Sequence, residues 1–189
     1  MAKEIPLFPL QTVLFPGGLL PLRIFEARYI DMISRCFKQE STFGVCFIRA
    51  GTETTTESFY EIGTTAKIND WDMDNDGLLN ISCTGEDRFQ LSRQKTEKDG
   101  LKVGQVELLK PEQKLQLEGE NEKLAQFLQN AFVQLPEHYK DQQTMFNDAT
   151  WVGYRLAELL PISMIQKQYL LEINDARQRL DILYPLMES

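Results

Sequence analysis

The chain has very little of the residue types that catalysis and metal binding most often use. Its 189 residues include one histidine, His138, and three cysteines. A histidine-based triad needs a nucleophile and an orienting acid that converge on the imidazole, and no Gly-x-Ser-x-Gly segment marks such a nucleophile. Zinc sites typically use paired cysteines at C-x-x-C spacing, and that spacing is missing. We therefore predict no catalytic residue and no metal ligand, and we interpret His138 as a surface residue.

Glycine-rich phosphate loops are missing as well. The sequence contains no Gly-x-x-x-x-Gly-Lys-Ser/Thr run and no Gly-x-Gly-x-x-Gly that follows a strand pattern. Such loops cradle phosphates with backbone N–H groups, so nucleotide and dinucleotide binding have no support. The sequence predicts a protein that is not an enzyme and that uses no cofactor.

No uninterrupted apolar run reaches the eighteen or so residues that a membrane span requires. The first six residues lack the apolar core and the cleavage site of a secretory signal. Cys36, Cys46 and Cys83 are widely spaced inside apolar patterns, which is typical of reduced, buried thiols. Together these features predict a cytoplasmic protein without a membrane partner.

The formal net charge is −8, from 20 Lys and Arg against 28 Asp and Glu. Residues 1–118 hold 14 basic and 18 acidic residues, and residues 119–189 hold 6 and 10, so each part carries −4. Nucleic-acid binding needs a basic face that releases counterions from phosphates. Because no dense basic cluster occurs, no nucleic-acid partner is expected.

Two patterns meet near residues 110–120. Before this seam, apolar residues alternate or form short runs between Gly and Pro, as in strands. After it, apolar residues recur at helical spacing. The sequence thus predicts an α+β fold, with a β-rich part at residues 1–115 and a C-terminal helical bundle at residues 116–189.

In the β-rich part, residues 4–8, 12–15 and 19–24 are predicted to be edge strands or strand ends, because proline cannot donate to a ladder. Residues 25–37 carry apolar side chains at a spacing of four and predict an amphipathic helix. The almost entirely apolar residues 43–48 predict a central strand.

The rest of the β-rich part is predicted as a hairpin and two further strands. Residues 62–68 and 79–83 form the hairpin, with a tight turn at Asp76-Gly77. Residues 88–92 and 101–109 complete the sheet. In the last strand the apolar phase changes at Gly104-Gln105, which predicts a bulge there.

Four helices are predicted in the C-terminal part, at residues 124–135, 152–160, 163–173 and 176–187. Asn147 or Asp148 is available to cap the second helix, and Asn174 is predicted to cap the fourth. Residues 137–146 have a weaker pattern and are interpreted as a loop or a short helix.

Three features have both a functional and a structural interpretation. Residues 72–77 match the first half of an EF-hand calcium loop, but position twelve is Cys83 instead of Glu; a solvated hairpin tip is the simpler interpretation. Trp71 and Trp151 are candidate recognition residues, since Trp is enriched at binding hot spots. Packing is favoured for Trp151, and both roles stay open for Trp71.

Several segments, in order and at consistent spacing, resemble the N-terminal substrate-binding domain of Lon proteases. The first is IPLFPLQTVLFPG at 5–17, followed by LPLRIFEARY at 20–29. Further similar segments lie at 60–68, 76–81, 85–91, 156–161 and 167–172, with Arg179-Leu180 near the end. The resemblance covers nearly the whole chain.

This resemblance implies a PUA-like β pseudobarrel followed by a helical bundle, in a stand-alone protein without ATPase or protease domains. It implies a non-catalytic module that recognises unfolded or extended polypeptide segments, as a substrate adaptor whose partners are a protease or its clients. Two alternatives are RNA binding, which other PUA-like folds perform, and an unrecognised enzyme site. The candidate binding surface consists of Phe15, Leu20, Trp71 and Met73. Among Glu26, Arg28 and Arg88, at least one charged pair is expected to brace the helix at residues 25–37.

Overall fold

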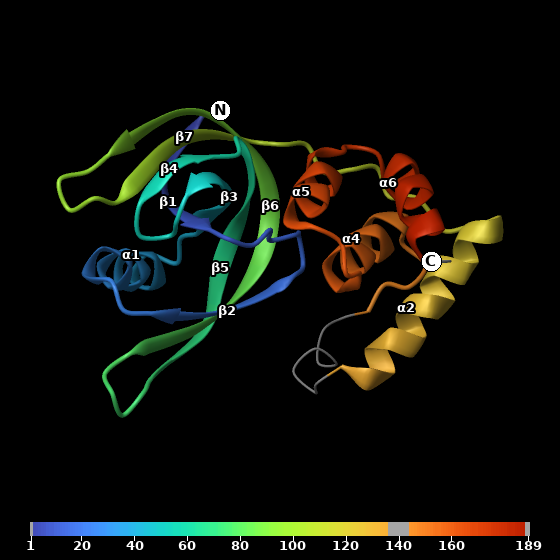
Figure 1. The fold of residues 1–189 in the computed structure, drawn as a ribbon, viewed down its shortest axis with the longest axis horizontal. Coiled ribbons are helices and arrows are strands. Elements are labelled where there is room, and N and C mark those ends of the chain that lie inside the picture. The colour runs from blue at the N-terminus through green and yellow to red at the C-terminus, as the bar shows by residue number, and fades with distance from the viewer. Residues whose placement is uncertain (1, 136–143, 188–189) are drawn as a thin grey trace. The chain divides into compact units, whose positions relative to one another are not determined.

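A computed structural model describes residues 2–135 and 144–187. The chain forms two compact units, Met1–Lys110 and Pro111–Ser189, and each is described by itself. The first unit is rich in strands and the second consists of helices and connecting segments (Figure 1). The predicted order of a β-rich part followed by helices is therefore confirmed. None of the described helices is long and apolar enough to cross a membrane.

The strands of the first unit form a seven-stranded mixed sheet. The pairing order is β1-β7-β6-β5-β3-β4, and β2 pairs with β6. Strand β1 also pairs in parallel with β3, so the order of pairing from β1 through β7, β6, β5 and β3 is closed. The strands are β1 (Lys3–Leu10), β2 (Leu19–Ile24), β3 (Phe43–Gly51), β4 (Thr56–Phe59), β5 (Ile62–Met73), β6 (Leu79–Thr96) and β7 (Lys102–Leu108). The two strands predicted at 79–83 and 88–92 are one long strand, β6, and residues 12–15 form no strand.

Strand β1 contains two prolines although it has a neighbour on each side. Its first half, from Lys3 to Leu7, pairs with β7, and its second half, from Leu7 to Leu10, pairs with β3. Pro6 and Pro9 therefore each lie where only one side of the strand is paired. Proline is tolerated where one side of a strand is unpaired, and both prolines of β1 meet this condition. The strand as a whole is nevertheless not an edge strand, because it has a paired neighbour on each side.

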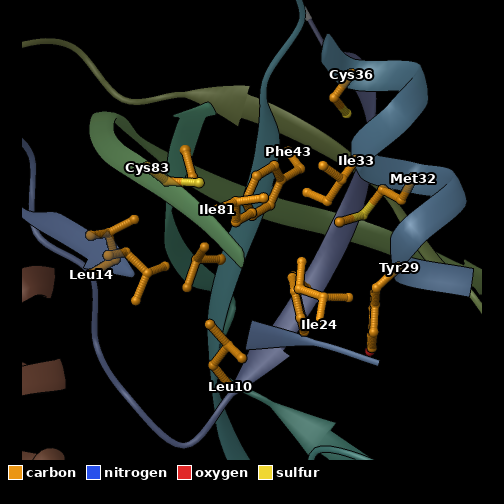
Figure 2. Packing of buried hydrophobic residues seen from close by; sticks show 14 of the residues in the cluster. Leu10, Leu14, Ile24, Tyr29, Met32, Ile33, Cys36, Phe43, Ile81 and Cys83 are labelled. Carbon is orange, nitrogen blue, oxygen red and sulfur yellow. The ribbon is translucent and has the colours of Figure 1, made fainter. Parts of the chain in front are cut away.

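Helix α1 (Ala27–Lys38) covers the larger of two apolar clusters in the first unit, which confirms the helix predicted at 25–37. Figure 2 shows its inward side chains directed at the strands. They are Tyr29, Met32, Ile33 and Cys36, all at most 3% exposed. Burying a large apolar side chain stabilises a fold by about 1.5–3 kcal/mol, so this face alone is a major stabilising contact.

The bulge predicted at Gly104-Gln105 does not lie on β7. Successive side chains of a strand point to opposite faces, and β7 buries both faces. Val103 belongs to the cluster beneath α1, whereas Val106 belongs to the second apolar cluster, with Phe89. The phase change thus reflects two cores. The nearby register shift lies on β6, between Leu91 and Arg93.

A charged pair forms between Glu26 and Arg28, but both residues lie at the start of α1, so the pair itself does not join the helix to the sheet. The Arg28 guanidinium lies 2.8 Å from the Glu26 carboxylate. It also donates a hydrogen bond of 2.9 Å to the carbonyl oxygen of Gly100, in the turn between β6 and β7. The start of α1 is thereby fixed to the sheet. Arg88 is buried in β6, and its carbonyl oxygen accepts a hydrogen bond from Leu109 N–H.

The three cysteines are free and buried, as predicted. Burial raises the pKa of the Cys83 thiol to about 12 and also raises those of Cys36 and Cys46. Thiolate is the reactive form. We expect the native protein to react with a thiol reagent such as DTNB at pH 8 far more slowly than a free thiol, and to release three equivalents once guanidinium unfolds it. Rapid labelling of the native protein would contradict this burial.

The second unit is built around α4 (Ala149–Leu159), which contacts α2 (Glu122–Gln134), α5 (Met164–Glu172) and α6 (Ala176–Leu183). Asp148 caps α4 by accepting a hydrogen bond from Trp151 N–H at 2.9 Å, as the sequence predicted. The cap of α6 is Asp175 and not Asn174, since the Asp175 carboxylate accepts Arg177 N–H at 2.8 Å. Trp151 is 7% exposed and packs against Phe132 and Phe146, in agreement with a packing role.

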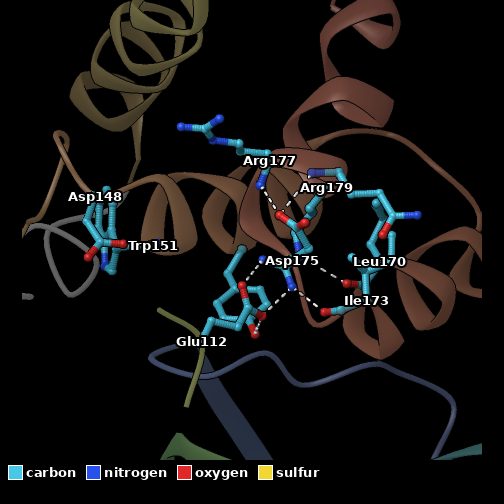
Figure 3. A network of polar contacts seen from close by, with 10 residues as sticks. Glu112, Asp148, Trp151, Leu170, Ile173, Asp175, Arg177 and Arg179 are labelled. Carbon is cyan, nitrogen blue, oxygen red and sulfur yellow. Dashed lines mark hydrogen bonds and ion pairs between the residues drawn. The ribbon is translucent and has the colours of Figure 1, made fainter. Parts of the chain in front are cut away.

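The boundary between the units lies after Lys110, five residues before the predicted boundary at residue 115. The reason is Glu112, whose carboxylate forms two hydrogen bonds with the Arg179 guanidinium, at 3.0 and 2.5 Å. Figure 3 shows this pair, with Arg179 also donating to the carbonyl oxygens of Leu170 and Ile173. The residues that follow Lys110 are therefore held by the helices.

Candidate binding surface

Two of the four candidate binding residues lie in the core. Phe15 is 0% exposed and Leu20 is 8% exposed, so the prediction that they form part of a binding surface is corrected. The backbone around them is tied to the sheet: Gly17 N–H donates to the Gly85 carbonyl oxygen at 2.7 Å, and the Thr64 hydroxyl donates to that of Leu14 at 2.6 Å. These bonds direct the apolar side chains of the segment inward.

The other two candidates, Trp71 and Met73, are 50% and 56% exposed. They lie two residues apart on β5, so their side chains point to the same face. There they meet Phe37 at the end of α1, which is 49% exposed; its ring centroid lies 6.3 Å from that of Trp71, edge to face. A concave apolar area results, which we call the α1–β5 surface. It is lined by Ile30, Ile33, Ser34, Phe37, Lys38, Trp71, Met73 and Leu79.

Phe37 was assigned to the buried stripe of α1 by its spacing, and its exposure was missed. A spacing of four residues advances 400° around a helix with 3.6 residues per turn, so each step drifts by about 40°. From Tyr29 to Phe37 the drift reaches about 80°. Tyr29 and Ile33 face the core, whereas Phe37 is 49% exposed. Phe25 is 67% exposed and lies before the first residue of α1, so its exposure has a different origin.

Asp70 and Asp72 alternate with Trp71 and Met73 along β5, so their side chains point to the opposite face of the hairpin. Asp74 forms an ion pair of 3.0 Å with Arg23 and accepts a hydrogen bond of 2.7 Å from the Asn80 amide. Asp70 and Asp72 instead accept the backbone N–H groups of Trp71 and Met73, at 2.9 and 2.8 Å. Lys38 lies on the helix side. The α1–β5 surface is thus mainly apolar, and the opposite face of β5 carries the acidic side chains.

The acidic tip does not have the surroundings of a calcium loop. Strands β5 and β6 flank it, where an EF-hand has helices. Gly77 has a φ of +77° and its N–H donates to the Asp74 carbonyl oxygen at 2.8 Å, which is the geometry of a turn. Across residues 2–135 and 144–187, no group of three or more His, Cys, Asp or Glu could hold a metal ion.

The clearest candidate for an acid–base group lies in the second unit. Burial raises the pKa of the Glu158 carboxyl to about 7, against the opposing charges of Arg155 and Lys167. Arg155 forms an ion pair of 2.8 Å with Glu158 one turn away on α4, and Lys167 of α5 donates to the Glu158 carbonyl oxygen at 2.6 Å. These contacts join α4 to α5, which is a structural role. His138 lies outside the described residues.

Comparison with known proteins agrees with this architecture. A structure of the Lon N-terminal domain protein from Xanthomonas campestris is 37% identical, with a TM-score of 0.82, and covers 97% of this chain and 98% of that one. The N-terminal domain of a Mycobacterium avium complex Lon protease shares the fold, with a TM-score of 0.68 at 16% identity over 99% of both chains.

Two longer relatives are also similar in sequence. Lon protease of Cytophaga hutchinsonii is 26% identical over 98% of this chain, and protein cereblon of Danio rerio is 29% identical over 57% of it. The chain spans about a quarter of the length of each, 24% and 26% respectively. The family model of the ATP-dependent protease La (LON) substrate-binding domain matches residues 4–189. This chain therefore belongs to the LON substrate-binding domain family.

Proposed function

We propose that this protein is a non-catalytic module that recognises unfolded or extended polypeptide segments through the α1–β5 surface. The observation that carries the proposal is the grouping of Phe37, Trp71 and Met73, which are about half exposed and come from two different elements. Exposed apolar patches with polar borders commonly mark interaction sites, and Trp is enriched among residues that dominate binding energy. Membership of a substrate-binding family supports the same reading.

The proposal extends to a PUA-like fold for the first unit and to an adaptor role in the cytoplasm. The closed order of strand pairing in the first unit supports a PUA-like pseudobarrel. An adaptor that presents clients to a protease in the cytoplasm fits both the family and the three buried, free thiols. The RNA-binding alternative gains no support, because the Asp residues beside the surface would repel phosphates.

The test is a titration of the protein into a labelled, unstructured, apolar peptide, followed by fluorescence anisotropy. Trp71→Ala is expected to weaken binding about 30-fold, the effect of a hot-spot residue. Tyr169→Ala is the matched control, since Tyr169 is 53% exposed on α5 of the other unit; it should leave the affinity unchanged. No binding at high micromolar protein, or equal losses in both variants, would refute the proposal.

A further inference from the structure

The outer edge of β5 is open beside the α1–β5 surface. Strand β5 pairs with β6 along most of its length but with β3 only from Thr64 to Ala66. Beyond that point, up to Met73, no second strand of the described residues pairs with this edge. An unpaired edge presents N–H and C=O groups that can pair with another chain.

The backbone N–H groups of this edge donate hydrogen bonds to neighbouring Asp carboxylates. In an antiparallel pair, alternate residues direct their backbone groups away from the partner strand. The N–H groups of Trp71 and Met73 donate to the carboxylates of Asp70 and Asp72, at 2.9 and 2.8 Å. Neither carboxylate forms an ion pair with any described Lys or Arg, and Arg23 is engaged by Asp74 at 3.0 Å.

We propose that a polypeptide segment with alternating apolar and basic residues adds as a strand to this edge of β5. The inference rests on the proposed function and narrows its substrate class. Side chains of an added strand alternate between the two faces of the sheet. Apolar side chains on one face enter the α1–β5 surface beside Trp71 and Met73. Lys or Arg side chains on the other face meet Asp70 and Asp72.

Basic residues are favoured in the incoming strand because strand addition frees the two carboxylates. Carbonyl oxygens of the incoming strand accept the N–H groups of Trp71 and Met73 and displace Asp70 and Asp72 from them. Both carboxylates are exposed, so once freed they are hydrated and available to a cation. A Lys or Arg on the incoming strand restores a charge-assisted hydrogen bond. Lys38, across the surface, is the one lining residue that favours an acidic ligand.

The test compares three short, blocked, fluorescein-labelled peptides that alternate Leu with Lys, Gln or Glu. The Lys peptide should bind about tenfold more tightly than the Gln peptide, as two modest ion pairs allow, and the Glu peptide should bind more weakly than both. Asp70→Asn/Asp72→Asn keeps an acceptor beside each N–H and should remove the preference for Lys. Glu57→Gln/Glu86→Gln changes the net charge equally at exposed sites and should retain that preference.

Strand addition itself is tested by measurements on backbone amide groups. Hydrogen exchange of the Trp71 and Met73 amides, followed by NMR, should slow at least tenfold when the Lys peptide is bound, and an N-methylated Lys peptide should lose most of its affinity. Equal affinity for the three peptides, or unchanged exchange at both amides, would overturn this inference while leaving the proposed function intact. Failure of all three peptides to bind would overturn both.

Discussion

Replacing Arg179 by Met is expected to lower the free energy of unfolding of the helical unit by about 3–5 kcal/mol, since this removes one partner of a buried ion pair. The Arg179 side chain is 0% exposed and that of Glu112 is 3% exposed. Beyond its contacts with Glu112, the guanidinium donates to two backbone carbonyl oxygens and lies 4.1 Å from the ring centroid of Tyr154. In the variant, the Glu112 carboxylate stays buried without its cation.

The measurement is urea-induced unfolding followed by circular dichroism at 222 nm, which reports mainly on the helices. Arg177→Met is the matched control, because Arg177 is an exposed Arg on the same helix and should change stability by no more than about 0.5 kcal/mol. Glu112→Leu/Arg179→Met should recover much of the loss, since an apolar pair can replace a buried ion pair. If Arg179→Met were no worse than the control, the pair would not be stabilising this unit.

Replacing Phe89 by Ala is expected to lower the stability of the β-rich unit by about 3–5 kcal/mol, through lost burial and the cavity left behind. Phe89 is 0% exposed at the centre of the second apolar cluster. Its ring fills the space above two glycines of neighbouring strands: a Cβ atom would lie 2.9 Å from the ring at Gly44 and 2.6 Å at Gly63.

Leu108→Ala is the matched control for Phe89→Ala. Leu108 faces Phe89 across the β6–β7 ladder but is 50% exposed, so its truncation should cost no more than about 0.5 kcal/mol. Thermal and urea unfolding of both variants in a Trp151→Phe background, where fluorescence reports on Trp71 in the same unit, provide the comparison. Similar midpoints for the two variants would show that the glycines and the ring are not packed as described.

Local patterns predicted most of the secondary structure, because strand alternation and helical spacing follow from backbone geometry. The central strand at 43–48, helix α1 and the cap at Asp148 needed only neighbouring residues to be recognised. The errors arose where a local pattern has two tertiary explanations. The phase change in β7 fits either a bulge or two cores, and the choice depends on what packs against each face.

Two of the four residues predicted for the candidate binding surface are exposed, and two are buried. Trp71 and Met73 were identified beside an acidic hairpin, where few apolar neighbours in sequence could cover them. Phe15 and Leu20 were included in the predicted surface, yet both are buried, and long-range hydrogen bonds tie the backbone of their segment to the sheet. Phe37 was missed because the drift around the helix was not counted, and its contact with Trp71 joins positions far apart in the chain.

The sequence by itself determined the family, the order of strands before helices, and the burial of the cysteines, since each depends on short motifs or local periodicity. The tertiary structure alone decided which apolar residues stay exposed. It also decided which charges are buried, as the pairing of Glu112 with Arg179 across 67 positions shows. Exposure and long-range pairing depend on which elements pack together, and many packings satisfy the same local pattern. The α1–β5 surface therefore exists only once α1 and β5 pack together.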